Sequence, residues 1–539
     1  MILPPIIPIA FLVLGALAVG AADLARLRRP SLFMMVAAGL ALAAMLALRA
    51  DGPITQVISG WLPISVFGVP VSFRVDTAAW IMGLGLIVAC LATALTWVAY
   101  PGKQRPAPRA VSLLFIACAL VSVFASNLLT LALAWGLLDV VFIMALLVRS
   151  GSEMGRRAAL AIVLNTASTL CVWVAALLIE NSHESLYWNM PHLASGPQAW
   201  LAAAVVLRLG LYPLHQWLPI ELGKEPDRAV LLIAVPSAVG LALWARMSIA
   251  HALPADSFVP VAAALSAIVG AVLAWRSPRP RVGLPYVALS LAGLAMMNTV
   301  VPASVGNMTA TTLNWLFIVI CLFISRGLDR RSPWWLLSAV IAGLSIAGIP
   351  GTLGFVTRQQ MITGLIDTHS WSLLAVCLIA EAVLIAATIR LIVSPATEQP
   401  PSGPLRQISF GLAQIIAALP LLLLVLKPGL IADVPSIDQL LAKVNVTNGL
   451  AWVLPIIFGL ILALLGHRFA THEAETSADQ PVWSSWLRLE WVVSLAAIPI
   501  RWITRFVRGI ASLIEGEGGL VWALVVIVVA VVLTSGAIK

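Results

Sequence analysis

Uninterrupted apolar runs of about twenty residues recur along this chain from one end to the other. A helix of that length crosses the hydrocarbon core of a bilayer, where every backbone N–H and C=O must bond within its own segment. Of the 539 residues, 61% are hydrophobic and 10% are charged, whereas soluble proteins carry about 25% charged residues. The runs therefore predict an all-α polytopic membrane protein.

The pattern predicts about sixteen transmembrane spans. The predicted spans cover residues 3–21, 31–49, 78–99, 110–125, 127–148, 157–180, 198–219, 229–249, 257–275, 282–301, 306–326, 333–357, 371–394, 407–427, 449–467 and 518–537. The first run begins almost at Met1, without a basic region or a small-residue cleavage site, so we interpret it as a retained span.

Basic residues concentrate in alternate loops. The loops after odd-numbered spans hold Arg26, Arg28, Arg29, Lys103, Arg105, Arg109, Arg149, Arg156, Arg157, Arg276, Arg279, Arg281, Arg326, Arg330 and Arg331. By the positive-inside rule these loops face the cytoplasm, which places the N-terminus outside a bacterial cytoplasmic (inner) membrane. The net charge of +9 is thus a topology signal, and we expect no binding of nucleic acid.

The C-terminal part of the chain differs from the rest. Residues 484–514 set tryptophans such as Trp491 against arginines such as Arg505, which predicts an amphipathic helix lying in the membrane interface. We divide the chain into N-terminal spans 1–3 (1–109), a first repeat (110–250), a second repeat (251–395), spans 14–15 (396–468), a linker with the interfacial helix (469–517) and a final span (518–539).

Motifs for soluble chemistry are missing from the sequence. The five cysteines lie singly inside apolar runs, and there is no Cys/His metal spacing, phosphate-binding loop or dinucleotide-binding motif. The loops are also too short to form a catalytic domain. We therefore expect no metal site, no cofactor and no catalytic centre within this chain.

Ionisable side chains inside the predicted spans are few, and each is a candidate functional residue because its burial in a membrane is costly. They are Asp139, Arg208, His215, Arg358, Glu381 and Arg390. Asp139 is either half of a structural ion pair or a proton-carrying carboxylate. His215 either packs in the interior or changes charge near neutral pH. Glu381 and Arg390 are nine residues apart on one helix, so we expect each to pair with another span.

Two predicted spans combine a proline with a cation. Span seven contains Arg208, Pro213 and His215, and span twelve contains Pro350, with Arg358 at its end. Proline removes a backbone hydrogen bond and breaks the helix, so the freed carbonyl groups need partners from protein or water. Discontinuous spans of this kind mark transport sites in transporters built from inverted repeats.

These segments resemble motifs of the antiporter-like membrane subunits shared by complex I, membrane-bound hydrogenases and Mrp-type antiporters. The residues that carry the resemblance are Trp135-Gly136-Leu-Leu (Trp-Glu-Leu-Leu in the family), Arg208 to Pro219 (Lys-Ser-Ala-Gln-x-Pro-x-His-x-Trp-Leu-Pro), Gly348 to Arg358 (Gly-Ile-Pro-Pro-x-x-Gly-Phe-x-x-Lys), Val71 to Asp76, and Arg390. The predicted interfacial helix and final span resemble a shortened lateral arm of the distal subunit.

The resemblance implies two inverted five-helix repeats, formed by spans four to eight and nine to thirteen, with broken helices in spans seven and twelve. It implies a half-channel in each repeat and a central polar axis that joins them. It also implies that the partners are other membrane subunits of a larger complex, and that any quinone binds in those other subunits.

The sequence departs from the family at the charged positions. Gly136 stands where the family has a glutamate, and Asp139 follows one turn later on nearly the same helix face. Arg208 and Arg358 stand where the family has lysines, and Ile233 stands where it has a histidine. Because arginine effectively never loses its proton, both arginines are expected to act as cations that switch ion-pair partners.

Three functions are compatible with these features. The first is an ion-translocating subunit of a complex I-like (NADH-quinone oxidoreductase-type) complex, which moves protons or Na⁺. The second is a structural subunit of such a complex that has lost pumping. The third is the membrane subunit of a proton-coupled uptake system for CO₂ or bicarbonate. In each case the chain belongs to an enzyme only through its complex.

Overall fold

The structure is a computed structural model of the full chain. It describes residues 4–25, 30–48, 53–58, 69–99, 107–150, 156–181, 186–187, 195–218, 226–249, 258–277, 280–298, 305–325, 336–393, 403–427, 430–431, 434–442 and 444–473. The chain forms two compact units, Met1–Ser477 and Ala478–Lys539. The interfacial helix predicted at 484–514 and the span predicted at 518–537 lie outside the described residues.

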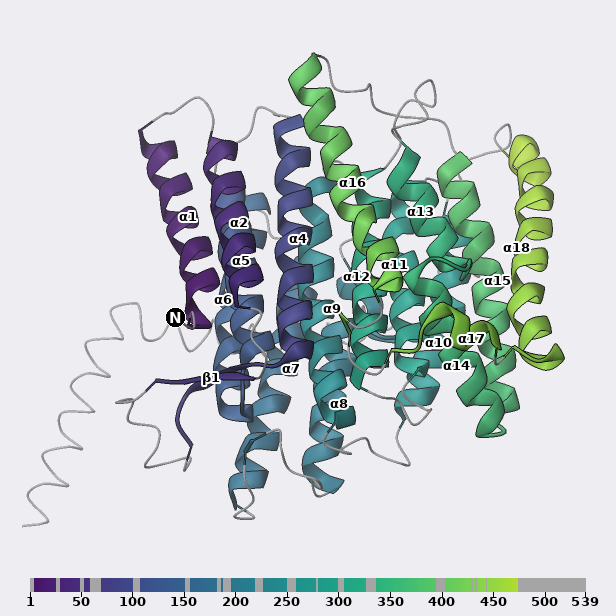
Figure 1. Ribbon diagram of the computed structural model, residues 1–539, viewed down its shortest axis with the longest axis horizontal. Coiled ribbons are helices and arrows are strands. Elements are labelled where there is room, and N and C mark those ends of the chain that lie inside the picture. The colour runs from purple at the N-terminus through teal and green to yellow at the C-terminus, as the bar shows by residue number, and fades with distance from the viewer. Residues whose placement is uncertain are drawn as a thin grey trace, which may run out of the picture. The chain divides into compact units, whose positions relative to one another are not determined.

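The apolar runs of the first unit form helices (Figure 1). They are α1 (Ile6–Leu24), α2 (Pro30–Ala47), α4 (Thr77–Ala99), α5 (Ala107–Phe124), α6 (Leu128–Ser150), α7 (Arg156–Asn181), α8 (Ser195–Leu209), α9 (Pro226–Ile249), α10 (Val259–Arg276), α11 (Pro280–Met297), α12 (Val305–Ile324), α13 (Leu337–Ile346), α14 (Leu353–Asp367), α15 (Trp371–Val393), α16 (Pro404–Leu426), α17 (Ile437–Ala442) and α18 (Val446–Glu473).

Among the residues described, nine helices are long and apolar enough to cross a membrane, and five shorter helices are also apolar. The protein is therefore a multi-pass helical membrane protein, while the count of sixteen spans stays a prediction. The predicted end of span twelve at residue 357 was wrong, because α14 continues to Asp367. Its second turn carries Thr357, Arg358, Gln359 and Gln360, which interrupt the apolar run.

Burial separates central helices from peripheral ones. In the most apolar 18-residue stretch of α9, and in that of α12, 94% is buried inside the structure. In the corresponding stretch of α18 the buried share is 22%. Helix α4 packs against α2, α5, α12 and α16, so an early helix of the chain contacts one from near its end. A helix that is apolar on every side is either enclosed by other helices or faces lipid, and this fold contains both kinds.

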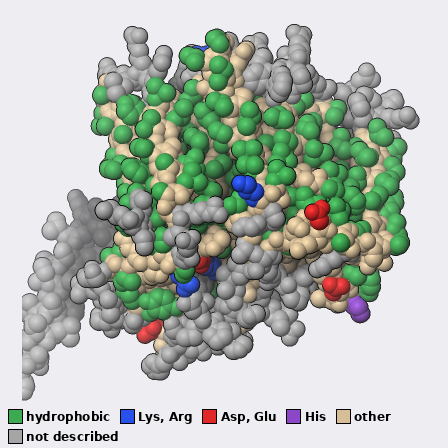
Figure 2. All heavy atoms as spheres, viewed as in Figure 1, with side chains coloured by type: hydrophobic (Ala, Val, Ile, Leu, Met, Phe, Trp, Pro, Cys, Tyr) green, Lys and Arg blue, Asp and Glu red, His purple; other side chains and the backbone are tan. Residues whose placement is uncertain are grey.

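The outer surface is apolar. Figure 2 shows hydrophobic side chains over most of the described helices on the face in view, with few charged groups among them. Leu17, Leu170 and Leu464 are 64%, 58% and 69% exposed. Such a surface is compatible with lipid as the surrounding solvent.

A small antiparallel sheet precedes α4. Strand β1 (Ile54–Val57) pairs with β2 (Ser72–Val75) in the register Ile54–Val75, and Phe73 also bridges to Ala125 beside the α5–α6 turn. The all-α prediction missed this sheet, because its strands are four residues long and the search followed runs of twenty. The Asn127 amide donates hydrogen bonds to the Pro70 carbonyl (2.9 Å) and to Ser72 Oγ (3.1 Å), which ties the sheet to the helices.

Candidate functional site

Helix α8 stops at Leu209 in a Schellman motif. The Leu211 amide donates to the Val206 carbonyl (3.1 Å), and Gly210, at φ +61°, donates to the Leu207 carbonyl (3.2 Å). A Cβ atom at Gly210 would lie 2.2 Å from Trp217 Nε1, so only glycine fits there. The chain then passes Pro213 into a short 3₁₀ turn, η1 (His215–Trp217).

The second break repeats this device at the end of α13. The Ile349 amide donates to the Leu344 carbonyl (3.0 Å), and Gly348, at φ +62°, donates to the Ser345 carbonyl (3.1 Å). Pro350 follows the glycine, and α14 begins at Leu353. Both helices therefore end four residues before the proline that predicted the break, α8 at Leu209 before Pro213 and α13 at Ile346 before Pro350.

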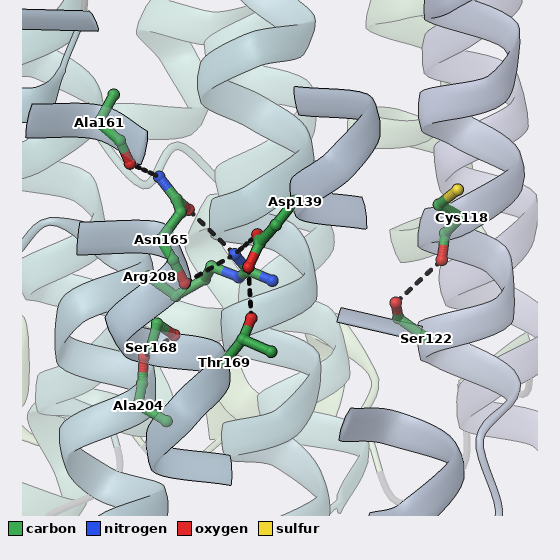
Figure 3. Close-up of polar contacts among 9 residues, drawn as sticks. All are labelled: Cys118, Ser122, Asp139, Ala161, Asn165, Ser168, Thr169, Ala204 and Arg208. Atoms are coloured by element: carbon green, nitrogen blue, oxygen red, sulfur yellow. Dashed lines mark hydrogen bonds and ion pairs between the residues drawn. The ribbon is translucent and has the colours of Figure 1, made fainter. Parts of the chain in front are cut away.

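The first buried ion pair lies at the end of α8. The Arg208 Nη1 group donates to Asp139 Oδ1 and also to Asn165 Oδ1 (3.1 Å), and Thr169 Oγ1 donates to Asp139 Oδ2 (2.5 Å). Figure 3 shows Asp139, Asn165, Thr169 and Arg208 pointing toward one another. Arg208 is fully buried and Asp139 is 6% exposed. Three helices, α6, α7 and α8, thus enclose one carboxylate and one guanidinium.

The surroundings of Arg208 explain why Asp139 is its partner. Trp135 lies one turn before Asp139 on the same face of α6, and its ring centroid is 4.3 Å from the guanidinium carbon of Arg208. On α9, Gly240 leaves room for the aliphatic stem of Arg208, since a Cβ there would be 3.3 Å from Arg208 Cγ. A Cβ at Gly136 would meet nothing within 4 Å. Asp139 of α6 therefore pairs with an Arg208 side chain that also packs against Trp135 and Gly240.

The second buried ion pair lies beside the break between α13 and α14. Arg358 Nη2 is 2.7 Å from Glu381 Oε2 on α15, and Arg358 Nη1 donates to the Ala347 carbonyl (2.6 Å). Both side chains are 5% exposed or less. The sequence predicted a partner for Glu381 on another span, and the structure confirms one. It corrects the position of Arg358, which lies in the first two turns of α14 rather than at the end of a span.

A cavity of about 50 Å³ adjoins this second pair. Its polar lining residues include Asn298, Thr311, Asn314, Ser345, Thr357, Arg358 and Glu381. A buried water needs roughly 10–15 Å³ and polar partners, so the cavity has room for a few waters. The uncharged members also bond to one another: the Asn298 amide donates to Thr311 Oγ1, and Ser345 Oγ donates to Asn314 Oδ1, both at 2.7 Å. Sequence reasoning missed these residues, because it searched the spans for charge only.

The other two candidate residues lie apart from these pairs. His215 is 1% exposed in η1, stacked on the Tyr212 ring at 5.3 Å between centroids, with the ring of Tyr286 on α11 at 6.3 Å. Arg390 Nη1 donates to the Trp275 carbonyl at the end of α10, so Arg390 bonds to another helix as its spacing from Glu381 predicted.

Comparisons with known proteins agree with this architecture. Residues 125–384, just under half of the chain, match the family described as NADH:quinone oxidoreductase/Mrp antiporter, transmembrane. A curated relative, NADH-quinone oxidoreductase subunit N of Geobacillus kaustophilus, is 27% identical over 282 residues, which are 46% of this chain and 57% of the relative. The alignments with curated relatives span between 40% and 64% of the relatives' own length.

Two solved structures share the fold. The Mrp complex from Dietzia sp. has a chain that superimposes with a TM-score of 0.74 at 18% identity, covering 98% of this chain and 63% of the other. The archaeal membrane-bound sulfane sulfur reductase has one with a TM-score of 0.67 at 17% identity, covering 98% of this chain and 99% of the other. At these identities the superpositions establish the fold alone.

Proposed function

We propose that this chain, whose residues 125–384 match the NADH:quinone oxidoreductase/Mrp antiporter family, is an antiporter-like membrane subunit of a complex I-like oxidoreductase or a related complex. In this proposal it takes part in redox-coupled translocation of protons or Na⁺. Its partners are other membrane subunits, it holds no cofactor of its own, and any quinone binds elsewhere in the complex. The N-terminus lies outside the cytoplasmic membrane.

The observation that supports this proposal is the placement of two buried ion pairs at two helix breaks. Arg208 is two residues before Gly210, and Arg358 donates to the carbonyl of Ala347, next to Gly348. Buried charges at unwound helix ends are the arrangement that membrane transporters use for ion sites. The two breaks share one Schellman geometry, which fits two related repeats, as the inverted-repeat interpretation expects.

The chemistry divides between the two members of each pair. The guanidinium groups stay charged, so Asp139 and Glu381 take up and release the proton. When Asp139 binds a proton, Arg208 retains the oxygen of Asn165 and the ring face of Trp135, so the cation remains stabilised without its ionic partner. Arg358 retains the Ala347 carbonyl in the same way when Glu381 is protonated. Each pair can thus open and close while its arginine changes from the carboxylate to these other partners.

A structural subunit without pumping is the second candidate function. The observations that favour it are arginine in place of lysine at both cationic positions and a fully buried Ile233 on α9, where the family has a histidine. With these replacements, the transfer of a proton between the two pairs requires water or uncharged side chains instead of a titrating residue.

Ion translocation by the native complex in proteoliposomes distinguishes the two functions. We expect Asp139→Asn and Glu381→Gln to reduce redox-driven proton uptake by about tenfold or more, because each removes a group that binds the proton. Ser168→Ala is the matched control, since it removes a neutral bond between α7 and α8 (Ser168 Oγ to the Ala204 carbonyl, 2.7 Å) close to the first pair. Assembled Asp139→Asn and Glu381→Gln complexes that pump at the wild-type rate would establish the structural role.

A further inference from the structure

Helix α18 closes over the second break through one tryptophan. The Trp452 indole Nε1 donates to the carbonyl of Gly348 (2.8 Å), and the backbone carbonyl of Trp452 accepts a bond from Arg358 Nη2 (3.1 Å). The Trp452 ring also packs edge-on against Phe355 of α14, with centroids 5.8 Å apart. One residue of α18 therefore contacts the glycine of the break and the cation beside it.

The arginine of the second pair depends on three helices. Its Nη1 group is held by Ala347 at the end of α13, and its Nη2 group is shared between Glu381 of α15 and Trp452 of α18. Hydrogen bonds to the other donors of the cation help to stabilise a buried ion pair, and here Nη1 and Nη2 have such bonds while the buried Nε has none. A shift of α18 would therefore remove one of the bonds that keep Arg358 beside Glu381.

The packing of α18 makes this contact specific. Gly459 of α18 approaches α15 so closely that a Cβ there would be 2.9 Å from the Ala382 carbonyl oxygen. Pro455 lacks an N–H, so the Ala451 carbonyl, next to Trp452, has no helical N–H partner four residues later. Val453, Leu454 and Phe458 of α18 are 38%, 40% and 55% exposed, so the described residues cover them only in part. Helix α18 thus packs mainly against α15, and Trp452 adds its contacts with Gly348 and Phe355.

We propose that Trp452 is a positioning residue of the second ion pair: its indole N–H fastens α18 to the Gly348 carbonyl, and its own carbonyl then holds Arg358 against Glu381. This inference rests on the proposed function, because positioning matters only where the Arg358–Glu381 pair takes part in ion translocation. It extends the site to α18, outside the residues that match the family.

A double-mutant cycle with Trp452→Phe and Glu381→Gln tests the inference on the full chain in lipid nanodiscs. We expect Trp452→Phe to lower the midpoint of thermal unfolding by roughly 1–3 °C. In the Glu381→Gln background the same change should have less than half that effect, because the pair it positions is gone. Trp80→Phe is the matched control: it removes an indole bond to the Met45 carbonyl (2.7 Å) far from the pair and should cost the same in both backgrounds. An equal loss for Trp452→Phe in both backgrounds would overturn the inference.

A spectroscopic measurement keeps the test independent of folding defects in the Trp452 variant. In protein labelled with 5-fluorotryptophan, the ¹⁹F resonance that disappears in Trp452→Phe belongs to Trp452. We expect Glu381→Gln to shift this resonance and to leave that of Trp80 unchanged, and an unchanged Trp452 resonance would overturn the inference. Neither measurement depends on transport, so a failure of the proposed function and a failure of this inference remain distinguishable.

Discussion

Asp139 and Arg208 show how single residues set the behaviour of a buried site. Replacing one partner of a buried pair leaves the other charge uncompensated, which is far more costly than losing a neutral hydrogen bond. Asp139 also accepts from Thr169, so both of its oxygens are occupied. Its contribution to folding and its contribution to transport must therefore be measured separately.

Asp139→Asn should lower the free energy of unfolding by roughly 3 kcal/mol, because Arg208 then remains charged and buried without an ionic partner. Ser168→Ala, which removes only the bond to the Ala204 carbonyl, should lower it by about 1 kcal/mol. Denaturant unfolding in mixed micelles gives both values. Equal values for the two variants would mean that the pair contributes no more than a neutral bond.

Asp76 gives a pH dependence at the residue level. Burial acts to raise the pKa of Asp76, but the Arg246 guanidinium and the Ala79 amide together outweigh it, so the pKa lies below its ordinary value of 3.8. A lowered pKa in the folded state stabilises the protein above pH 3.8, and this stability is lost as the pH falls through the folded-state value.

Asp76→Asn should therefore melt at a lower temperature than wild type at pH 7, and the difference should shrink as the pH falls below about 4. Differential scanning fluorimetry across that range checks the expectation. Asp367→Asn, at the exposed end of α14, is the control and should show a smaller difference at pH 7. If the difference in melting temperature between Asp76→Asn and wild type stays constant with pH, the lowered pKa of Asp76 is not its cause.

At the level of elements, the break between α13 and α14 is set by glycines with different surroundings. Gly348 (φ +62°) and Gly351 (φ +93°) both have backbone conformations that side chains rarely adopt. A Cβ at Gly348 would be 2.7 Å from Arg358 Cδ, while one at Gly351 would meet nothing within 4 Å. The backbone strain is thus shared, but only Gly348 touches the ion pair.

Gly351→Ala should destabilise the protein by about 1–2 kcal/mol through backbone strain alone. Gly348→Ala should cost more and should also reduce ion translocation, because the new methyl group displaces Arg358 from Glu381. Thermal unfolding and proteoliposome transport, measured on the same two variants, check both parts. Equal transport in the two variants would show that the position of Arg358 is unimportant.

At the level of the whole molecule, the two ion pairs form separate clusters. The first is built on α6, α7, α8 and α9, and the second on α13, α14, α15 and α18, with no residue in both. Sites that share no partners make additive contributions to stability. Transport differs, because a proton that crosses the membrane by way of both sites requires each of them.

The double variant Asp139→Asn/Glu381→Gln should accordingly lose stability equal to the sum of the single losses, within about 0.5 kcal/mol. Its transport rate should be no lower than that of the slower single variant, since one blocked step already stops the flow. Measurements of unfolding and transport on the wild type, the two single variants and the double variant test both expectations. Additive losses in transport would indicate two independent routes.

Several features of this protein could be predicted from its sequence, because they depend on local chemistry. Apolar runs of helical length require lipid as solvent, so the membrane class and most helix positions follow from composition and periodicity. Proline removes a backbone hydrogen bond of a helix, so Pro213 and Pro350 located both breaks. Burial in a membrane is costly for any charge, which singled out Asp139, Arg208, Arg358 and Glu381 in advance.

Tertiary structure alone decided which of these groups meet. Asp139 pairs with Arg208 across 69 residues of sequence, and Arg358 with a carbonyl of Trp452 across 94. Such pairings depend on how helices turn and pack against one another, and uniformly apolar helices carry almost no amphipathic signal that would orient them. For the same reason the uncharged cavity residues, and the role of α18 over the second break, emerged only once the helices were placed in space.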